Sequence, residues 1–153
     1  MDALTILLVD DDRNLAATLS YGLRKAMGEA ISVVFCSSGP EAFAMMAKQS
    51  FDVVISDFHM PGISGLELLK KIKQDHHKTS LVLITAYGTD MLEEEVQRLG
   101  FGYVTKPFEM PLLLQSIHGL MEVKESNKVT KDVSHIVTQE DSADPSQPMS
   151  NAS

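Results

Sequence analysis

Carboxylate, ammonium and hydroxyl side chains stand at the ends of four short apolar runs of this 153-residue sequence. They are Asp10, Asp11, Asp57, Thr85 and Lys106. Carboxylates held close together repel one another and need a counter-charge. Ligands with oxygen atoms suit Mg²⁺, which binds through one or two carboxylates and keeps water and phosphate in the rest of its shell. The residue types therefore predict a site for Mg²⁺ and phosphate, provided that the fold brings these run ends together.

The same groups favour phosphoryl transfer. A divalent cation, the ammonium of Lys106 and the hydroxyl of Thr85 could hold the three oxygens of a transferring phosphoryl group. Asp57 would be the nucleophile and would form an aspartyl-phosphate. Each residue also has a simpler interpretation: an aspartate after a strand often caps the next helix, and we favour this for Asp12. Lys106 could be a solvated lysine and Thr85 a turn residue, but their joint placement at separate run ends favours one site.

The apolar runs predict strands of a parallel sheet, because none of them alternates strictly between apolar and polar residues. They are Leu4–Val9, Ile31–Phe35, Phe51–Ser56, Leu81–Thr85 and Phe101–Thr105. Segments with helical spacing lie between them, for example Leu15, Leu19 and Leu23. Five repeats of strand and helix predict an α/β fold, a flavodoxin-like doubly wound sheet with strand order 2-1-3-4-5 and five helices.

Capping residues mark the helix starts. Ser38–Glu41 and Ser64–Glu67 have the spacing of capping boxes, in which a hydroxyl and a carboxylate each accept from a free backbone N–H. Asp90 with Glu93 is a weaker example of the same pattern. We expect the last helix to run to about Val123.

The composition changes after residue 123. Residues 124–153 contain no aromatic residue and no glycine, and their end is polar and contains proline. We therefore expect a folded domain over residues 1–123 and a polar tail over residues 124–153, disordered or forming a short docking helix. The apolar residues at helical spacing in that tail are Val129, Val133, Ile136 and Val137.

Charge and cysteine content exclude several classes of protein. The formal net charge of −8 argues against direct binding of nucleic acid, which usually requires a basic surface. A single cysteine, Cys36, excludes an internal disulfide framework and favours a reducing, cytoplasmic setting. No apolar run approaches the length of a membrane span, and we see no secretion signal, so we expect no membrane partner.

Four stretches of the sequence carry a resemblance to a known family. They are Ile6–Asp11, Val53–Gly65, Leu83–Ala86 and Gly102–Phe108. Together they resemble the receiver domain of two-component response regulators, over Leu4 to about Val123. The resemblance implies a signalling protein of a phosphorelay, phosphorylated by a sensor histidine kinase or a histidine phosphotransfer protein. It does not imply an enzyme that turns over a separate substrate.

The resemblance also implies roles for individual residues. Asp57 is the implied phosphoacceptor, and Asp10 and Asp11 are the implied acidic pair of the Mg²⁺ site, completed by Asp57 and the backbone carbonyl of His59. Lys106 would contact the phosphoryl oxygens, and its bond to Pro107 would be cis.

A switch is implied as well. Thr85 would move toward the phosphate while the ring of Tyr103 turns inward, and a downstream protein would bind the face of the fourth helix, fifth strand and fifth helix. His59 and Tyr87 flank the path of the attacking water in this family. Both are bulky here, so we expect slow loss of phosphate.

Two other classes of protein remain as alternatives. A phosphatase of the haloacid dehalogenase type also has a nucleophilic aspartate after its first strand, but Asn14 and the short chain fit it poorly. A flavin-binding module would need a phosphate loop that three aspartates would repel. Within the favoured family, we expect a stand-alone regulator, with a fragment of a longer regulator as the alternative.

Overall fold

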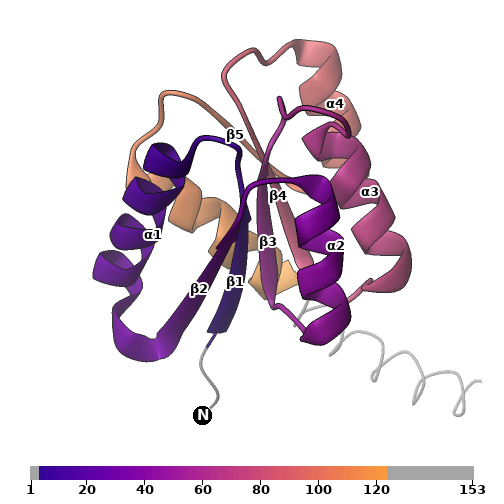
Figure 1. Ribbon diagram of the computed structural model, residues 1–153. Helices are drawn as coiled ribbons and strands as arrows, with labels where there is room; N and C mark the ends of the chain where they lie inside the picture. The colour runs from indigo at the N-terminus through magenta and orange to yellow at the C-terminus, as the bar shows by residue number, and fades with distance from the viewer. Residues whose placement is uncertain (1–3, 124–153) are drawn as a thin grey trace, which may run out of the picture. The chain divides into compact units, whose positions relative to one another are not determined.

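Five parallel strands form a single sheet in the computed structural model, which describes residues 4–123 (Figure 1). The order β2-β1-β3-β4-β5 confirms the predicted topology. The strands are β1 (Leu4–Val9), β2 (Ile31–Cys36), β3 (Val53–Asp57), β4 (Ser80–Thr85) and β5 (Gly102–Thr105). The chain divides into two compact units, Met1–Leu120 and Met121–Ser153, and the sheet belongs to the first.

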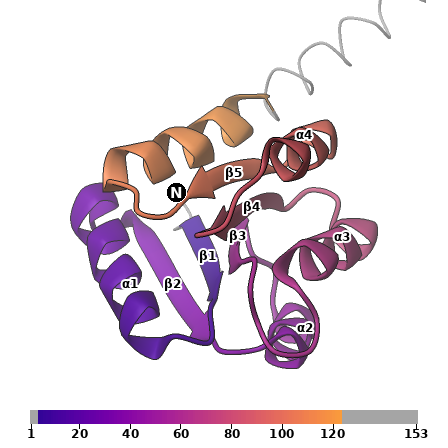
Figure 2. The same cartoon turned by 90° about the horizontal axis from the view of Figure 1, so that it is seen from above.

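Helices cover both faces of the sheet. α1 and the helix over residues 110–123 lie on one face, and α2, α3 and α4 lie on the other (Figure 2). The labelled helices are α1 (Arg13–Met27), α2 (Gly39–Lys48), α3 (Gly65–Asp75) and α4 (Asp90–Arg98), with a 3₁₀ turn, η1, at Gly28–Ala30. Because both faces are covered, every residue of β4 and the first four of β3 are buried, which explains the unalternating apolar runs.

The predicted caps are confirmed in part. Asp12 caps α1, as we expected, by accepting from the backbone N–H groups of Asn14 and Leu15. Ser38 and Ser64 cap α2 and α3 through their hydroxyls. The prediction for α4 was wrong, because Thr89 is the cap and Asp90 is the first helical residue. The Thr89 hydroxyl accepts from the third residue beyond it, as an N-cap requires.

Several strand boundaries differ from the prediction by one or two residues: β2 ends at Cys36 rather than Phe35, β3 ends at Asp57 rather than Ser56, and β4 begins at Ser80 rather than Leu81. β3 begins at Val53 rather than Phe51. Asp52 before it still bonds to β1 and β4 through its backbone, and its side chain accepts from the backbone N–H of Thr5 at 2.8 Å. β5 begins at Gly102 because the N–H of Phe101 donates to Val96, which closes the end of α4.

Residues 124–153, for which we expected a polar tail, lie outside the described residues. Within residues 4–123, none of the helices combines the length and the apolar character that crossing a membrane requires.

Candidate phosphoryl-transfer site

The strand register brings the predicted site residues to one edge of the sheet. Val9 of β1 pairs with Ser56 of β3, so Asp10 and Asp57, the residues that follow them, are neighbours. In open parallel sheets, ligands bind at this edge, beyond the carboxyl ends of the strands.

The β4 and β5 ends reach the same edge. Asp57 pairs with Ile84 of β4, and Thr85 pairs with Thr105 of β5. Lys106 is therefore the first residue after the last paired residue of β5. The backbone N–H of Lys106 still donates to the carbonyl of Thr85 at 2.7 Å. The site residues are therefore held by the same hydrogen bonds that hold the sheet.

Lys106 joins the carboxylates. Its Nζ lies 2.9 Å from Oδ1 of Asp57 and 3.7 Å from Oδ2 of Asp10. The Asp57 side chain is 11% exposed and that of Lys106 is 21% exposed, so the pair is largely shielded from solvent. The Lys106–Pro107 peptide bond is cis, as the resemblance implied.

Asp10 is the buried carboxylate of the cluster. Burial raises its pKa above the ordinary value, and the charges of Asp57 and Asp11 raise it further. The backbone N–H of Asp12, which donates to Asp10 Oδ1 at 2.9 Å, and the Lys106 ammonium lower it in opposition. The net rise in pKa comes first from burial. The charge balance follows from the groups themselves, because the three carboxylates of Asp10, Asp11 and Asp57 have one lysine ammonium, that of Lys106, among them.

Three carboxylates could share one cation. Oxygen atoms of Asp10, Asp11 and Asp57 all lie within 4.8 Å of one another. An all-oxygen donor set with surplus negative charge fits Mg²⁺, which favours carboxylate oxygens and retains water. The residues present therefore fit the ion that the sequence predicted. That the carbonyl of His59 contributes a ligand stays a prediction.

Thr85 and Tyr103 lie on neighbouring strands but occupy different surroundings. Thr85 is fully buried, and its Oγ1 accepts from the backbone N–H of Tyr87 at 3.1 Å. Tyr103 packs against the hydrophobic core, with its hydroxyl end beside Gly88 of the β4–α4 loop. Burial, followed by the charges of Glu93 and Asp90, raises the pKa of the Tyr103 phenol.

An aromatic row borders the site. The rings of Phe58 and His59 pack edge to face with their centroids 4.9 Å apart, and those of His59 and Tyr87 do so with their centroids 5.5 Å apart. His59 and Tyr87 are both exposed, Tyr87 at 76%. The sequence marked both positions as bulky, but it could not show that the two rings touch.

Gly65 is a structural requirement that sequence reasoning missed. A Cβ at this first residue of α3 would overlap the carbonyl oxygen of Asp57 and lie 2.8 Å from its carbonyl carbon. The Gly65 N–H also donates to the carbonyl of Phe58 at 2.9 Å. A glycine in the first turn, where it weakens a helix, was the available signal.

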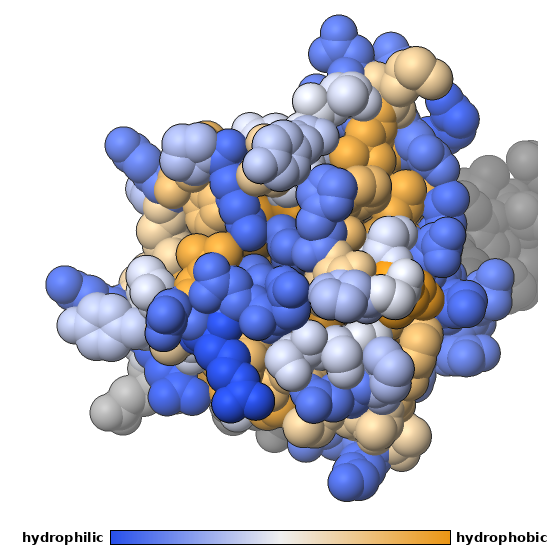
Figure 3. Space-filling model, turned by 45° about the horizontal axis from the view of Figure 1, so that its top comes forward, coloured by the Kyte–Doolittle hydropathy of each residue, from blue (hydrophilic) through white to orange (hydrophobic). Residues whose placement is uncertain are grey.

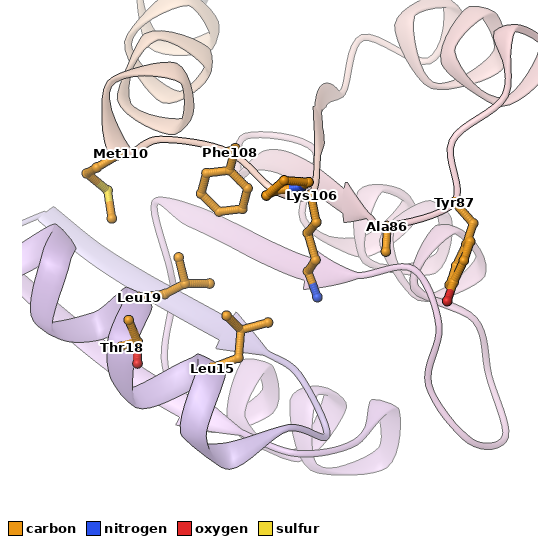
Figure 4. A pocket seen from close by; sticks show the side chains of 9 residues that line it. Leu15, Thr18, Leu19, Ala86, Tyr87, Lys106, Phe108 and Met110 are labelled. Carbon is orange, nitrogen blue, oxygen red and sulfur yellow. The ribbon is translucent and has the colours of Figure 1, made fainter.

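A mainly apolar pocket of about 640 Å³ adjoins Lys106. It opens between α1 and the segment after β5, and Figure 4 shows α1 side chains on one wall opposite Phe108 and Met110. Its lining residues are Leu15, Thr18, Leu19, Ala86, Tyr87, Lys106, Pro107, Phe108 and Met110. The space-filling view of this end shows hydrophilic residues gathered near the centre with apolar surface beside them (Figure 3). A protein that reaches Lys106 from this side therefore meets an apolar surface first.

Comparison with known proteins identifies the family. The family model described as the response regulator receiver domain matches residues 6–118, which include all of the predicted site residues. The chain belongs to the response regulator receiver domain family. The Asp10, Asp11 and Asp57 cluster is typical of the Mg²⁺-binding phosphoacceptor site of such receivers.

Individual relatives agree with this assignment. The receiver is 32% identical over 139 residues to the uncharacterized transcriptional regulatory protein YkoG of Bacillus subtilis, covering 89% of this chain and 58% of YkoG. It is 36% identical over 116 residues to the response regulator protein FleR of Pseudomonas aeruginosa, covering 75% of this chain and 24% of FleR. The chain thus spans less than two thirds of either relative.

A solved structure shares the fold. The response regulator protein TrrA of Thermotoga maritima, in complex with Mg²⁺ and beryllofluoride, superposes with a TM-score of 0.66 at 30% identity. The match covers 76% of this chain and 98% of TrrA.

Proposed function

We propose that Asp57 of this receiver accepts a phosphoryl group from a phosphohistidine of a sensor histidine kinase or a histidine phosphotransfer protein. The observation that carries the proposal is the contact of Asp57 Oδ1 with Lys106 Nζ at 2.9 Å, inside a cluster of three carboxylates. A nucleophilic carboxylate and a phosphate-binding ammonium are thereby already side by side.

Mg²⁺ is the proposed cofactor, held by Asp10, Asp11, Asp57 and the backbone carbonyl of His59. When bound, the ion neutralises charge that develops on the phosphoryl oxygens. Lys106 adds a second positive charge, and Thr85 adds a hydroxyl, which accepts from the backbone N–H of Tyr87 and has one proton of its own to donate.

The reaction moves one group between two proteins. A carboxylate oxygen of Asp57 attacks phosphorus and forms an acyl phosphate, while the phosphorus–nitrogen bond of the donor breaks. The histidine nitrogen keeps the electron pair and takes up a proton. We place the donor over the apolar pocket beside α1, because Lys106 and Tyr87 line both that pocket and the rim of the site.

The output is a change in binding rather than turnover of a separate substrate. Phosphorylation adds nearly two negative charges, which we propose draw Thr85 and Tyr103 into a new arrangement. A downstream protein would bind the face formed by α4, β5 and the helix over residues 110–123. With a net charge of −8, we expect no direct contact with nucleic acid from this domain, and with one buried thiol, Cys36, we place it in the cytoplasm.

Acetyl phosphate labelling tests the proposal. Wild type should incorporate phosphate in amounts equimolar with protein when Mg²⁺ is present, and very little after chelation. Asp57→Asn should not be labelled under either condition. Continuous release of phosphate over many turnovers would instead support the phosphatase alternative. Labelling that persists in Asp57→Asn would contradict the assignment.

A further inference from the structure

The phenol end of Tyr103 occupies space that exists because residue 88 has no side chain. A Cβ at Gly88 would overlap the Tyr103 hydroxyl, and it would lie 3.2 Å from Tyr103 Cζ and 3.2 Å from Thr105 Cγ2. The positive-φ glycines of the described chain are elsewhere, at positions 28, 62 and 100. What Gly88 contributes is therefore the space that the Tyr103 hydroxyl occupies, and not a left-handed backbone.

The loop that carries Gly88 is tied to the phosphoryl-transfer site. Thr85 Oγ1 accepts from the N–H of Tyr87, the residue before Gly88, at 3.1 Å. The carbonyl of Thr85 accepts from the N–H of Lys106 at 2.7 Å. The Thr85 hydroxyl is thus hydrogen-bonded to a loop whose next residue, Gly88, lies against the Tyr103 hydroxyl.

We propose that Gly88 is a positioning residue, which admits the Tyr103 hydroxyl against the β4–α4 loop and so couples Thr85 to the orientation of the Tyr103 ring. The positioning of the Tyr103 ring by Gly88 is a property of the unphosphorylated protein and does not depend on the proposed function. The coupling between Thr85 and the ring rests on the proposed function. A side chain at position 88 displaces the ring, and the ring then no longer follows the loop.

The position of Tyr103 has a consequence at the surface. Tyr103 lines a shallow groove of about 460 Å³ between β5 and the helix over residues 110–123, together with Leu112 and Gln115. Leu112 is 55% exposed. Gly88, which is not a member of this groove, thus sets the shape of one of its walls.

Gly88→Ala in the full chain tests the positioning role by NMR. We expect loss of the cross-relaxation between the Tyr103 ring protons and residue 88, and a shift of the ring resonances toward those of a solvated tyrosine. Gly119→Ala is the matched control, because a Cβ there meets no atom within 4 Å, and it should leave the Tyr103 resonances unchanged. Unchanged Tyr103 resonances and cross-relaxation in Gly88→Ala would overturn the proposal.

Removal of the phenol oxygen is the second arm. The closest overlap is with the hydroxyl, so the double variant Gly88→Ala/Tyr103→Phe should regain the contact between the ring and residue 88. If the ring stays displaced in the double variant, the side chain at position 88 does not act through the Tyr103 hydroxyl, and the inference is overturned.

Coupling is measured by adding Mg²⁺ and beryllofluoride. The ring resonances of residue 103 should shift on this addition in wild type and in the double variant, and they should not shift in Gly88→Ala. An equal response in all three overturns the coupling. Acetyl phosphate labelling is run in parallel: if wild type is not labelled, the proposed function fails, while the first arm still decides the positioning role.

Discussion

The ammonium of Lys106 faces two carboxylates at once, at 2.9 Å from Asp57 and 3.7 Å from Asp10. We propose that the arrangement serves phosphate binding more than stability, because a buried ion pair recovers little beyond the cost of desolvating its charges. Removing the Lys106 ammonium should nevertheless destabilise the fold, because the negative charges of Asp10 and Asp57 would then face one another with no positive side chain between them.

We therefore expect Lys106→Met to lower the free energy of unfolding, by less than the about 3–5 kcal/mol of a fully buried pair because both side chains keep some exposure. Mg²⁺ should restore part of the loss. Urea denaturation with and without Mg²⁺ measures both effects. Lys70→Met is the control, because the Lys70–Glu95 pair is over 40% exposed on both sides and should contribute less than about 1 kcal/mol. A Lys106→Met protein as stable as wild type, with no response to Mg²⁺, would contradict this account.

The contact between His59 and Tyr87 should slow the loss of phosphate, because the rings of both residues border the site where water must enter. We expect His59→Ala/Tyr87→Ala to release phosphate faster, by up to about tenfold, which corresponds to about 1.4 kcal/mol of barrier. The decay of labelled protein after removal of acetyl phosphate gives the rate. Equal rates in the variant and wild type would show that these rings do not shield the acyl phosphate.

At the scale of elements, the β3–α3 connection is packed against the residue that we propose is phosphorylated. The first residue of α3, Gly65, packs closely against the Asp57 carbonyl and donates its N–H to the carbonyl of Phe58, so the start of the helix is linked to the end of the strand. A displacement of the backbone at this junction should therefore also displace the Asp57 carboxylate.

Gly65→Ala should accordingly destabilise the receiver by about 1–3 kcal/mol and reduce labelling, since backbone rather than a flexible side chain must move. Thermal unfolding and acetyl phosphate labelling measure the two effects. Gly119→Ala, a helical glycine with open space around it, should instead be neutral or slightly stabilising. If both variants behave alike, the packing at Gly65 is looser than described.

Much of the element arrangement was predictable from the sequence. Buried parallel strands produce continuous apolar runs, so the five strands and their carboxyl ends could be located, and with them Asp10, Asp57 and Lys106. The cap of α4 was not found, because Thr89 and Asp90 are adjacent and both can cap. The contacts of Gly65 and Gly88 depend on atoms distant in the sequence, and local patterns do not encode such contacts.

At the scale of the whole molecule, a local charge event must change a surface. Shifting a population from mostly inactive to mostly active takes about 5 kcal/mol of differential stabilisation. Hydrogen bonds to a charged phosphate are each worth about 1.5–3 kcal/mol, so Lys106 and Thr85 together can supply much of it. We propose that the β4–α4 loop and Tyr103 then carry the change toward the α4 and β5 face.

The folded unit should work without the residues that follow it. We expect a protein truncated after Val123 to keep the same extent of labelling and a thermal midpoint within a few degrees of the full chain, because the family match ends at residue 118. Circular dichroism and acetyl phosphate labelling compare the two. A truncated protein that unfolds or is not labelled would show that residues 124–153 belong to the functional domain.

The central claim is that the phosphoryl group resides on Asp57, and chemical mapping of the acyl phosphate tests it most directly. Borohydride reduces an aspartyl-phosphate to homoserine, which mass spectrometry locates in the sequence after proteolysis. After labelling with acetyl phosphate and Mg²⁺, homoserine should appear at position 57. Homoserine at position 10, 11 or 12 instead, or at none of these positions in protein that has taken up phosphate, would contradict the account.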